Sequence, residues 1–311
     1  MLQYMIIMLD DTATSFCHYE NGKTERKAIP IDTLRKAIRF AMTENLMIQF
    51  LYPEHDLPEE IKVEIETIDH SKIKPFQDDE TDVVVVNDRN FYNTDGSIPI
   101  VLRTDKSGFF ANQDKIAETL STAKRLNIVI TDIEKFTDED FTNYKETLER
   151  LSKEIEKLYV EGKSPQLNIL TDRMMLKQMN NCGAGDTTIT LAPNGKFYVC
   201  AAFYHESESD SVGDLDNGLD IKNRQLFKLD HAPICRKCDA WQCRRCAWLN
   251  RKTTLEVNTP SHEQCVVAHL ERNASKALLE AIRPHGTFLP EVDAIKEIDY
   301  LDPFDKREEW S

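Results

Sequence analysis

The stretch 235-CRKCDAWQCRRC-246 holds two C-x-x-C units that are separated by only four residues. Further out, Cys182 and Cys200 precede this stretch and Cys265 follows it, so that seven of the eight cysteines lie in one part of the chain. The C-x-x-C spacing allows two thiolates to ligate one metal. In a reducing compartment, such crowding favours metal or iron–sulfur ligation over a disulfide framework.

Two metal chemistries compete for these thiols. Zinc ribbons usually separate their two C-x-x-C knuckles by roughly 12–20 residues, whereas only four residues separate Cys238 from Cys243. Seven cysteines also exceed one four-coordinate zinc site and fall one short of two. Iron–sulfur clusters tolerate tight and irregular spacing. The spacing therefore favours iron–sulfur ligation, with zinc as the alternative.

A β-hairpin is predicted over residues 187–200, TTITLAPNGKFYVC, with its turn at Pro193-Asn194-Gly195. The hairpin would bring Cys182 and Cys200 close together at its base.

The first half of the chain alternates β-rich runs with helical patterns. Strands are predicted at residues 4–9, 46–51, 83–86, 98–102, 127–131 and 167–170. Helices are predicted from Asp32 as N-cap and at residues 57–68, 115–123 and 138–161, the last with a capping box from Thr137 to Asp140. This order predicts an α/β fold with a mainly parallel sheet, a partial (β/α) TIM-like barrel.

Three segments are predicted. The barrel covers residues 1–172, a small loop-rich, cysteine-rich domain covers residues 173–285, and an acidic tail covers residues 286–311.

Charge and hydropathy exclude several function classes. The chain has 39 Lys and Arg against 54 Asp and Glu, a net charge of −15, which argues against binding to DNA, RNA or anionic lipid. No apolar run approaches the roughly 20 residues that span a bilayer. The opening MLQYMIIML has no basic residue before it and no cleavage site after it, so it is not expected to be a signal peptide. A cytoplasmic protein is predicted.

The cysteine pattern resembles a known family. C-x12-G-x4-C from Cys182 to Cys200, then the double C-x-x-C and a final cysteine, resembles the SPASM domain. That domain follows the radical S-adenosylmethionine (SAM) barrel in enzymes that modify ribosomally made peptides. The usual spacing is C-x2-C-x5-C-x3-C, whereas the spacings here are two, four and two. More narrowly, residues 1–53 and 256-EVNTPSHEQCVVAHLE-271 resemble the maturase family that is paired with Cys-x-x-x repeat peptides.

This resemblance implies maturation of a Cys-x-x-x repeat precursor peptide, with SAM and one or two auxiliary 4Fe-4S clusters as cofactors. A second maturase or an electron donor would be a further partner. The implied ligands of the first auxiliary cluster are Cys182, Cys200 and Cys246. Those of the second are Cys235, Cys238, Cys243 and Cys265. The first cluster's usual fourth cysteine is absent upstream. Asp172 as a substitute, an open iron for a substrate thiolate, and a lost or zinc-filled site are the alternatives.

The catalytic motif of the family is broken in this chain. Radical SAM enzymes carry C-x3-C-x2-C after the first strand. With Cys17 as the third position, the first two positions hold Asp10 and Thr14. Of the family's Gly-Gly-Glu segment only Glu54 is retained, as a cofactor-binding candidate. One thiolate with a carboxylate and a hydroxyl is a poor donor set for a low-potential cluster.

Three functions therefore stay open: a SAM-cleaving maturase, a catalytically degenerate peptide-binding partner, and a zinc-structured binding protein. Cys17 is either a remnant of the catalytic motif or a buried strand-end thiol.

The residues around the cysteines have expected roles of their own. Trp241, Trp248 and Tyr204 would shield the clusters from solvent. Arg236, Lys237, Arg244 and Arg245 would offset the negative charge of thiolate-ligated clusters.

Overall fold

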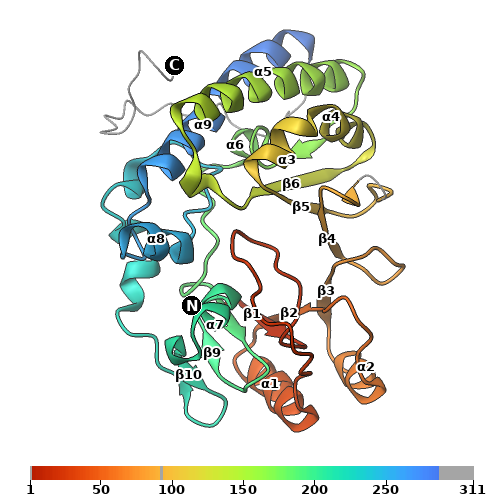
Figure 1. Ribbon diagram of the computed structural model, residues 1–311, viewed down its shortest axis with the longest axis vertical. Helices are drawn as coiled ribbons and strands as arrows, with labels where there is room; N and C mark the ends of the chain where they lie inside the picture. Colours follow the sequence, from red (N-terminus) through yellow and green to blue (C-terminus); the bar gives the residue numbers. More distant parts are fainter. Residues whose placement is uncertain (1, 92–93, 287–311) are drawn as a thin grey trace.

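A nine-stranded sheet organises the computed structural model, which describes residues 2–91 and 94–286 (Figure 1). The sheet order is β7-β6-β5-β4-β3-β2-β1-β8-β9, and all neighbours pair in parallel except β8 and β9. The strands are β1 (Tyr4–Met8), β2 (Met47–Leu51), β3 (His70–Lys74), β4 (Val83–Asn87), β5 (Ile100–Thr104), β6 (Arg125–Ile130), β7 (Gln166–Leu167), β8 (Thr188–Leu191) and β9 (Phe197–Tyr198). The predicted α/β class, a partial TIM-like barrel built on a mainly parallel sheet, is confirmed.

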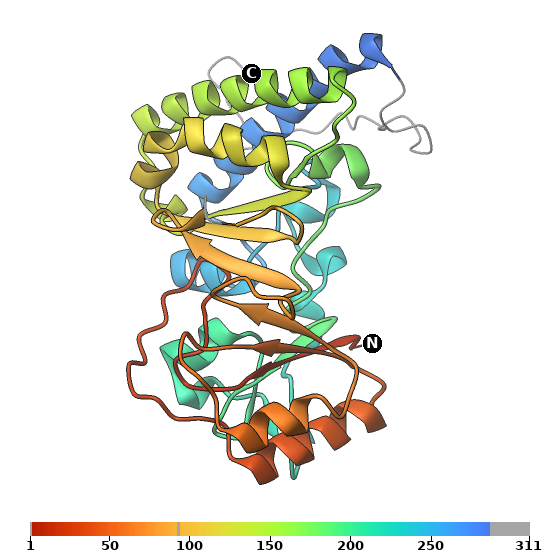
Figure 2. The same cartoon turned by 90° about the vertical axis from the view of Figure 1, so that its right-hand side faces the viewer.

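Helices cover the two ends of this sheet separately. The helices α1 (Ile31–Thr43) and α2 (Glu59–Ile65) lie at the β1–β2 end. At the β5–β6 end lie α3 (Lys106–Ala111), α4 (Gln113–Thr122) and α5 (Asp138–Val160) (Figure 2). The predicted capping box of Thr137 and Asp140 starts α5.

Four further helices and a small second sheet follow β7 in the described part of the chain. The helices are α6 (Asp172–Met175), α7 (Ala201–Glu206), α8 (Ala247–Thr254) and α9 (His262–Ile282), and α9 packs along α5. The second sheet pairs β10 (Gly213–Asp214) with β11 (Gly218–Leu219).

Several element predictions need correction. The strand β3, HSKIK, was not expected because it is rich in charge. Its two lysines are buried and pair with carboxylates: Lys72 with Glu66 at 2.5 Å, and Lys74 with Asp78 at 2.8 Å. A buried charge is tolerated when it is paired in this way.

Other boundaries also differ from the sequence-based expectation. The helix α1 has Pro30 rather than Asp32 as its N-cap, and no side chain caps it. The strand expected at residues 167–170 is only two residues long, because Leu170 N–H already bonds back to Leu167 in a turn. The short helix α3 was also not expected.

The sheet continues beyond residue 172. The strand β8 pairs with β1, Tyr4 opposite Thr188, and β9 closes the predicted hairpin, Thr190 opposite Tyr198. The division at residue 172 therefore remains a prediction about folding units, not a break in the sheet. The predicted acidic tail lies outside the described residues except for Gly286.

Alternation along β1 separates two environments. Met5 and Ile7 face α1 and α2, whereas Ile6 and Met8 face a buried cluster that contains Tyr204 and Trp248. The face that carries Ile6 and Met8 therefore borders the cysteine-bearing segment. Within the described residues, no helix is both long and apolar enough to cross a membrane.

Candidate functional site

None of the eight cysteines, all of which lie in the described part of the chain, is in a disulfide. The predicted ligands gather in two places. We define the first cysteine group as Cys182, Cys200 and Cys246. The second cysteine group comprises Cys235, Cys238, Cys243 and Cys265. These are the sets that the SPASM resemblance assigned to two clusters.

The four thiols of the second cysteine group line one cavity, together with Met179 and His269. A single 3-10 turn begins at Cys235, and the N–H of Cys238 donates to the carbonyl of Cys235 at 3.0 Å. The fourth member comes from α9, whose start is fixed by a capping box at Ser261. Nε2 of His269, one helix turn further on, lies 3.6 Å from Sγ of Cys238. His269 therefore faces this group from α9.

Burial shapes the acid–base state of this group. Burial first, and neighbouring thiolates to a smaller extent, raise the pKa of the Cys238 and Cys243 thiols to about 12. Free thiols at these positions are protonated at neutral pH, so that a metal must displace the protons. The guanidinium of Arg245 lowers the pKa of Cys243, as expected for a residue that offsets thiolate charge.

A buried ion network holds the loop between Cys238 and Cys243. Arg173 Nε donates to the Asp239 carbonyl at 3.0 Å, and Arg272 Nη1 donates to Asp239 Oδ1 at 3.1 Å. Burial alone would raise the pKa of Asp239, but Arg272, Lys276 and Arg173 together hold it below its ordinary value. This carboxylate therefore fixes the loop to α6 and α9. The sequence offered no sign of this role.

A second buried carboxyl lies beside the same loop. Glu271 on α9 accepts hydrogen bonds from the Tyr144 hydroxyl at 2.7 Å and from Gln242 Nε2 at 3.2 Å. Burial nevertheless raises the pKa of Glu271 to about 7. This group thus holds a proton near neutral pH.

The first cysteine group lies at the starts of two helices. Cys200 is the N-cap of α7, and Cys246 is the N-cap of α8, where its sulfur accepts the Leu249 N–H at 3.5 Å. The Cys182 N–H donates to the Arg244 carbonyl at 3.0 Å. Burial raises the pKa of Cys200 and Cys246, and the charge of Cys182 raises both further. The three thiols are therefore electrostatic neighbours.

The three aromatic residues that were predicted to shield the clusters pack near the cysteines. Tyr204 and Trp248 belong to the buried cluster that Cys200 and Cys246 contact. Trp241 packs with Cys235 in a smaller cluster.

Cys17 lies on the long loop between β1 and α1. Its backbone carbonyl accepts Arg103 Nε at 2.9 Å, and its side chain contacts the same buried cluster as Cys200 and Cys246. Burial, then the charges of Cys246 and Cys182, raise the pKa of Cys17.

At the other positions of the broken motif, Asp10 has partners of its own, whereas the Thr14 hydroxyl is buried without a hydrogen-bond partner. Oδ1 of Asp10 accepts the N–H of Thr12 at 2.7 Å, and its Oδ2 lies 3.6 Å from His55 Nε2. The Thr14 N–H donates to the Tyr52 carbonyl at 2.9 Å. Glu54 is exposed. The loop after β2 thus directs His55, which sequence reasoning passed over, toward the β1 loop, and leaves Glu54 in solvent.

Asp172 is engaged elsewhere. Its two carboxylate oxygens accept hydrogen bonds from Nη1 and Nη2 of Arg125 at 3.0 and 2.9 Å. Nη2 of Arg244 lies 4.0 Å from Oδ2 of Asp172. This two-pronged pairing occupies the carboxylate that we had considered as a substitute ligand.

The donor sets fit iron–sulfur clusters. Each group offers only sulfur ligands, and backbone N–H groups point at the sulfurs, Ala240 at Cys238 (3.4 Å) and Leu249 at Cys246 (3.5 Å). Such hydrogen bonds tune cluster potentials. Across residues 2–91 and 94–286, no three His, Cys, Asp or Glu side chains form a compact site for a single metal ion.

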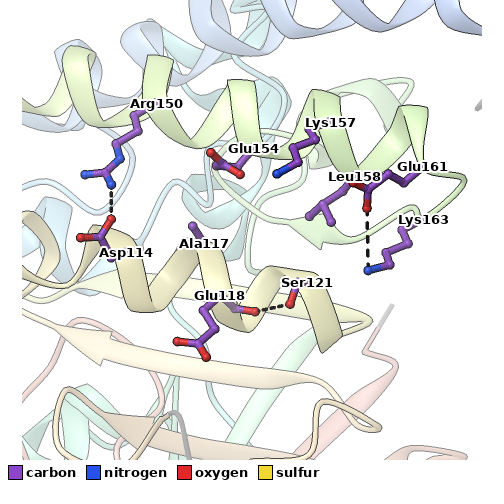
Figure 3. A pocket seen from close by; sticks show the side chains of 10 residues that line it. All are labelled: Asp114, Ala117, Glu118, Ser121, Arg150, Glu154, Lys157, Leu158, Glu161 and Lys163. Atoms are coloured by element: carbon purple, nitrogen blue, oxygen red, sulfur yellow. Dashed lines mark hydrogen bonds and ion pairs between the residues drawn. The ribbon is translucent and has the colours of Figure 1, made fainter.

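A separate surface hollow lies between α4 and α5 and is lined by charged side chains, with no cysteine among them (Figure 3). Arg150 pairs with Asp114 across it, and Lys163 lies 4.0 Å from Glu161. These side chains neutralise one another, and we assign the hollow no function.

Comparison with solved structures gives the fold a context. The chain is similar to anSMEcpe with bound AdoMet, at 11% identity and a TM-score of 0.60, over 91% of this chain and 100% of that one. It is also similar to anSMEcpe with bound AdoMet and Kp18Cys peptide, at 12% identity and a TM-score of 0.60, over 90% and 99%. No family model matches the sequence, and no curated protein matches it. At these identities the likeness shows a shared fold.

Proposed function

We propose that the protein takes part in the maturation of a Cys-x-x-x repeat peptide, as a radical SAM/SPASM-type protein that carries two auxiliary iron–sulfur clusters. The observation that carries this proposal is the gathering of the SPASM-type cysteines into two groups within a fold of the radical SAM type. The similar protein anSMEcpe binds AdoMet together with a peptide, which supports a peptide as the substrate class here. Eight cysteines outside any disulfide suit a reducing compartment, and we place the protein in the cytoplasm.

Clusters held by these groups would supply one-electron transfer. The chain's own residues provide the sulfur ligands, exclude water with Trp241, Trp248 and Tyr204, and place Arg244 and Arg245 near the thiolates. Asp239 fixes the loop that carries Cys238 and Cys243.

Within this function, a role without SAM cleavage by this chain is favoured. Asp10 is bonded to Thr12 and faces His55, Thr14 is bonded through its backbone, and Glu54 is in solvent. These residues do not form a donor set for a low-potential cluster. The chain would then bind the peptide and pass electrons to or from a partner maturase or electron donor.

The deciding experiment is a metal and product analysis of the full chain purified without oxygen. We expect about eight iron and eight sulfide per chain, binding of a Cys-x-x-x repeat peptide, and no 5′-deoxyadenosine with SAM and a strong reductant. Zinc without sulfide would overturn the iron–sulfur proposal in favour of a zinc-structured binding protein. Formation of 5′-deoxyadenosine would restore the SAM-cleaving alternative.

A further inference from the structure

Cys17 lies 165 residues before Cys182 in sequence, yet it packs against the same buried cluster as Cys200 and Cys246 of the first cysteine group. Three observations on its loop, its neighbours and the position of Cys182 lead to one inference, which rests on the proposed iron–sulfur function.

The first observation is that the loop around Cys17 is held in place. Arg103 from β5 donates Nε to the Cys17 carbonyl at 2.9 Å and Nη2 to the Tyr19 carbonyl at 2.7 Å. Nδ1 of His18 lies 2.9 Å from the carbonyl of Ile130, the last residue of β6. The loop therefore runs from β1 across the carboxyl ends of β5 and β6. Open α/β sheets commonly bind ligands at this edge.

The second observation is that this loop packs on α7 and α8, the helices whose N-caps are Cys200 and Cys246. The Tyr19 ring stacks on His205 of α7, with centroids 5.5 Å apart, and meets Trp248 of α8 edge-on at 6.5 Å. Cys17, Cys200 and Cys246 all contact one buried cluster. Tyr19, two residues after Cys17, thus packs on α7 and α8, and Cys17 itself lies against the same buried cluster as Cys200 and Cys246.

The third observation concerns Cys182, the member of the first cysteine group that begins no helix. Its N–H donates to the carbonyl of Arg244 at 3.0 Å, two residues before Cys246. Cys182 is thus held beside the start of α8, the helix whose Trp248 meets the Tyr19 ring.

We propose that Cys17 is the fourth ligand of the first cluster, so that the loop after β1 completes an auxiliary site instead of a catalytic one. All eight cysteines are then used, four in each site. The first cluster would have four thiolates and no free iron position for a substrate thiolate. Its role would be electron transfer, and the peptide would bind elsewhere.

The experiment isolates the first site. In a Cys238→Ala, Cys243→Ala background, which removes half of the second cysteine group, we compare Cys17→Ala, Cys17→Ser and the positive reference Cys200→Ala. Each variant of the full chain is purified without oxygen, and iron, sulfide, Mössbauer spectra and EPR spectra after mild oxidation are recorded. Without Cys17, iron should fall from about four per chain to about three or fewer. The EPR signal of a three-iron cluster should then appear.

Each outcome has a definite meaning. Loss or conversion of the cluster in Cys17→Ala, with an altered spectrum in Cys17→Ser, supports ligation by Cys17. Unchanged spectra in both variants would overturn it. Loss of the cluster in Cys17→Ala together with an unchanged spectrum in Cys17→Ser would also overturn the proposal. The cluster would then need a side chain of this size at position 17, and not its sulfur. If the background protein holds no iron at all, or Cys200→Ala changes nothing, the proposed cluster function itself fails.

Discussion

The two cysteine groups differ in how far apart their members lie in the sequence. The second group takes three thiols from one loop, between Cys235 and Cys243, and the fourth from the adjacent helix α9. The first group takes its thiols from the β8 approach, from the start of α7 and from the start of α8. With Cys17 it also draws on the loop after β1. One site is therefore local and the other is a product of the whole fold.

This difference bears on function. A local site depends mainly on its own loop, here fixed by Asp239, and it can assemble once α9 is in place. A site that joins the β1 loop to α7 and α8 depends on correct docking of the barrel and of the cysteine-rich segment. The metal content of the first site thus reports on tertiary folding, whereas that of the second reports mainly on local structure.

The largest effect should come from deleting one group at a time. Cys238→Ala with Cys243→Ala should remove about half of the iron and sulfide and leave the first-site spectrum intact. The reciprocal pair, Cys200→Ala with Cys246→Ala, should remove the other half. Iron and sulfide analysis with Mössbauer spectroscopy measures both. If either pair removed all of the iron, the two sites would not be independent, and the comparison would break.

The next effect concerns the loop of the second group. Asp239→Asn should lower the free energy of unfolding by about 3 kcal/mol, because Arg173 and Arg272 would face a neutral amide in a buried setting. Chemical denaturation measures this change, and iron analysis should show selective loss from the second site. The control is Asp230→Asn at an exposed aspartate. Equal stability of the two variants would show that the network does not hold the loop.

The same contrast explains what could be predicted from the sequence. The C-x-x-C pairs and the hairpin follow from short-range patterns, whereas the division of the seven cysteines into two groups came from the resemblance to the SPASM domain. The neighbours of Cys17 could not be predicted, because they depend on Arg103 of β5 and Trp248 of α8, far apart in the chain.

The missed elements have equally physical causes. The strand β3 was hidden because its lysines are neutralised by Glu66 and Asp78, and no hydropathy pattern reports such pairing. The interpretation of Glu54 rested on resemblance alone, and the loop after β2 turns that side chain to solvent while directing His55 inward.

A further prediction tests the buried carboxyl beside the second group. Glu271 has a pKa of about 7 in the folded chain, against an ordinary value of 4.5. Between these values the folded state binds the additional proton, so stability is fully present below about pH 4.5 and is lost as pH rises through 7. The loss approaches roughly 3 kcal/mol at alkaline pH.

Glu271→Gln should remove this dependence. The variant should be more stable than the unmodified chain at about pH 8.5 and no more stable at about pH 5. Denaturation at the two pH values measures the difference, with Glu280→Gln at an exposed site of the same helix as the control. Parallel stability curves for Glu271→Gln and the unmodified chain would refute a proton on Glu271.

The smallest expected effect comes from Arg103, which holds the loop after β1 in place. Arg103→Lys replaces a guanidinium that reaches two carbonyls, those of Cys17 and Tyr19, with a single ammonium. The free energy of unfolding should fall by about 1 kcal/mol, and the loop should open more often. Release of iron to a chelator should then become several-fold faster from the first site and stay unchanged at the second. The control, Arg89→Lys at an exposed position, should alter neither rate. If Arg103→Lys released iron from both sites at unchanged rates, the β1 loop would not control the first site. The first site would then depend on Cys182, α7 and α8, and not on the β1 loop.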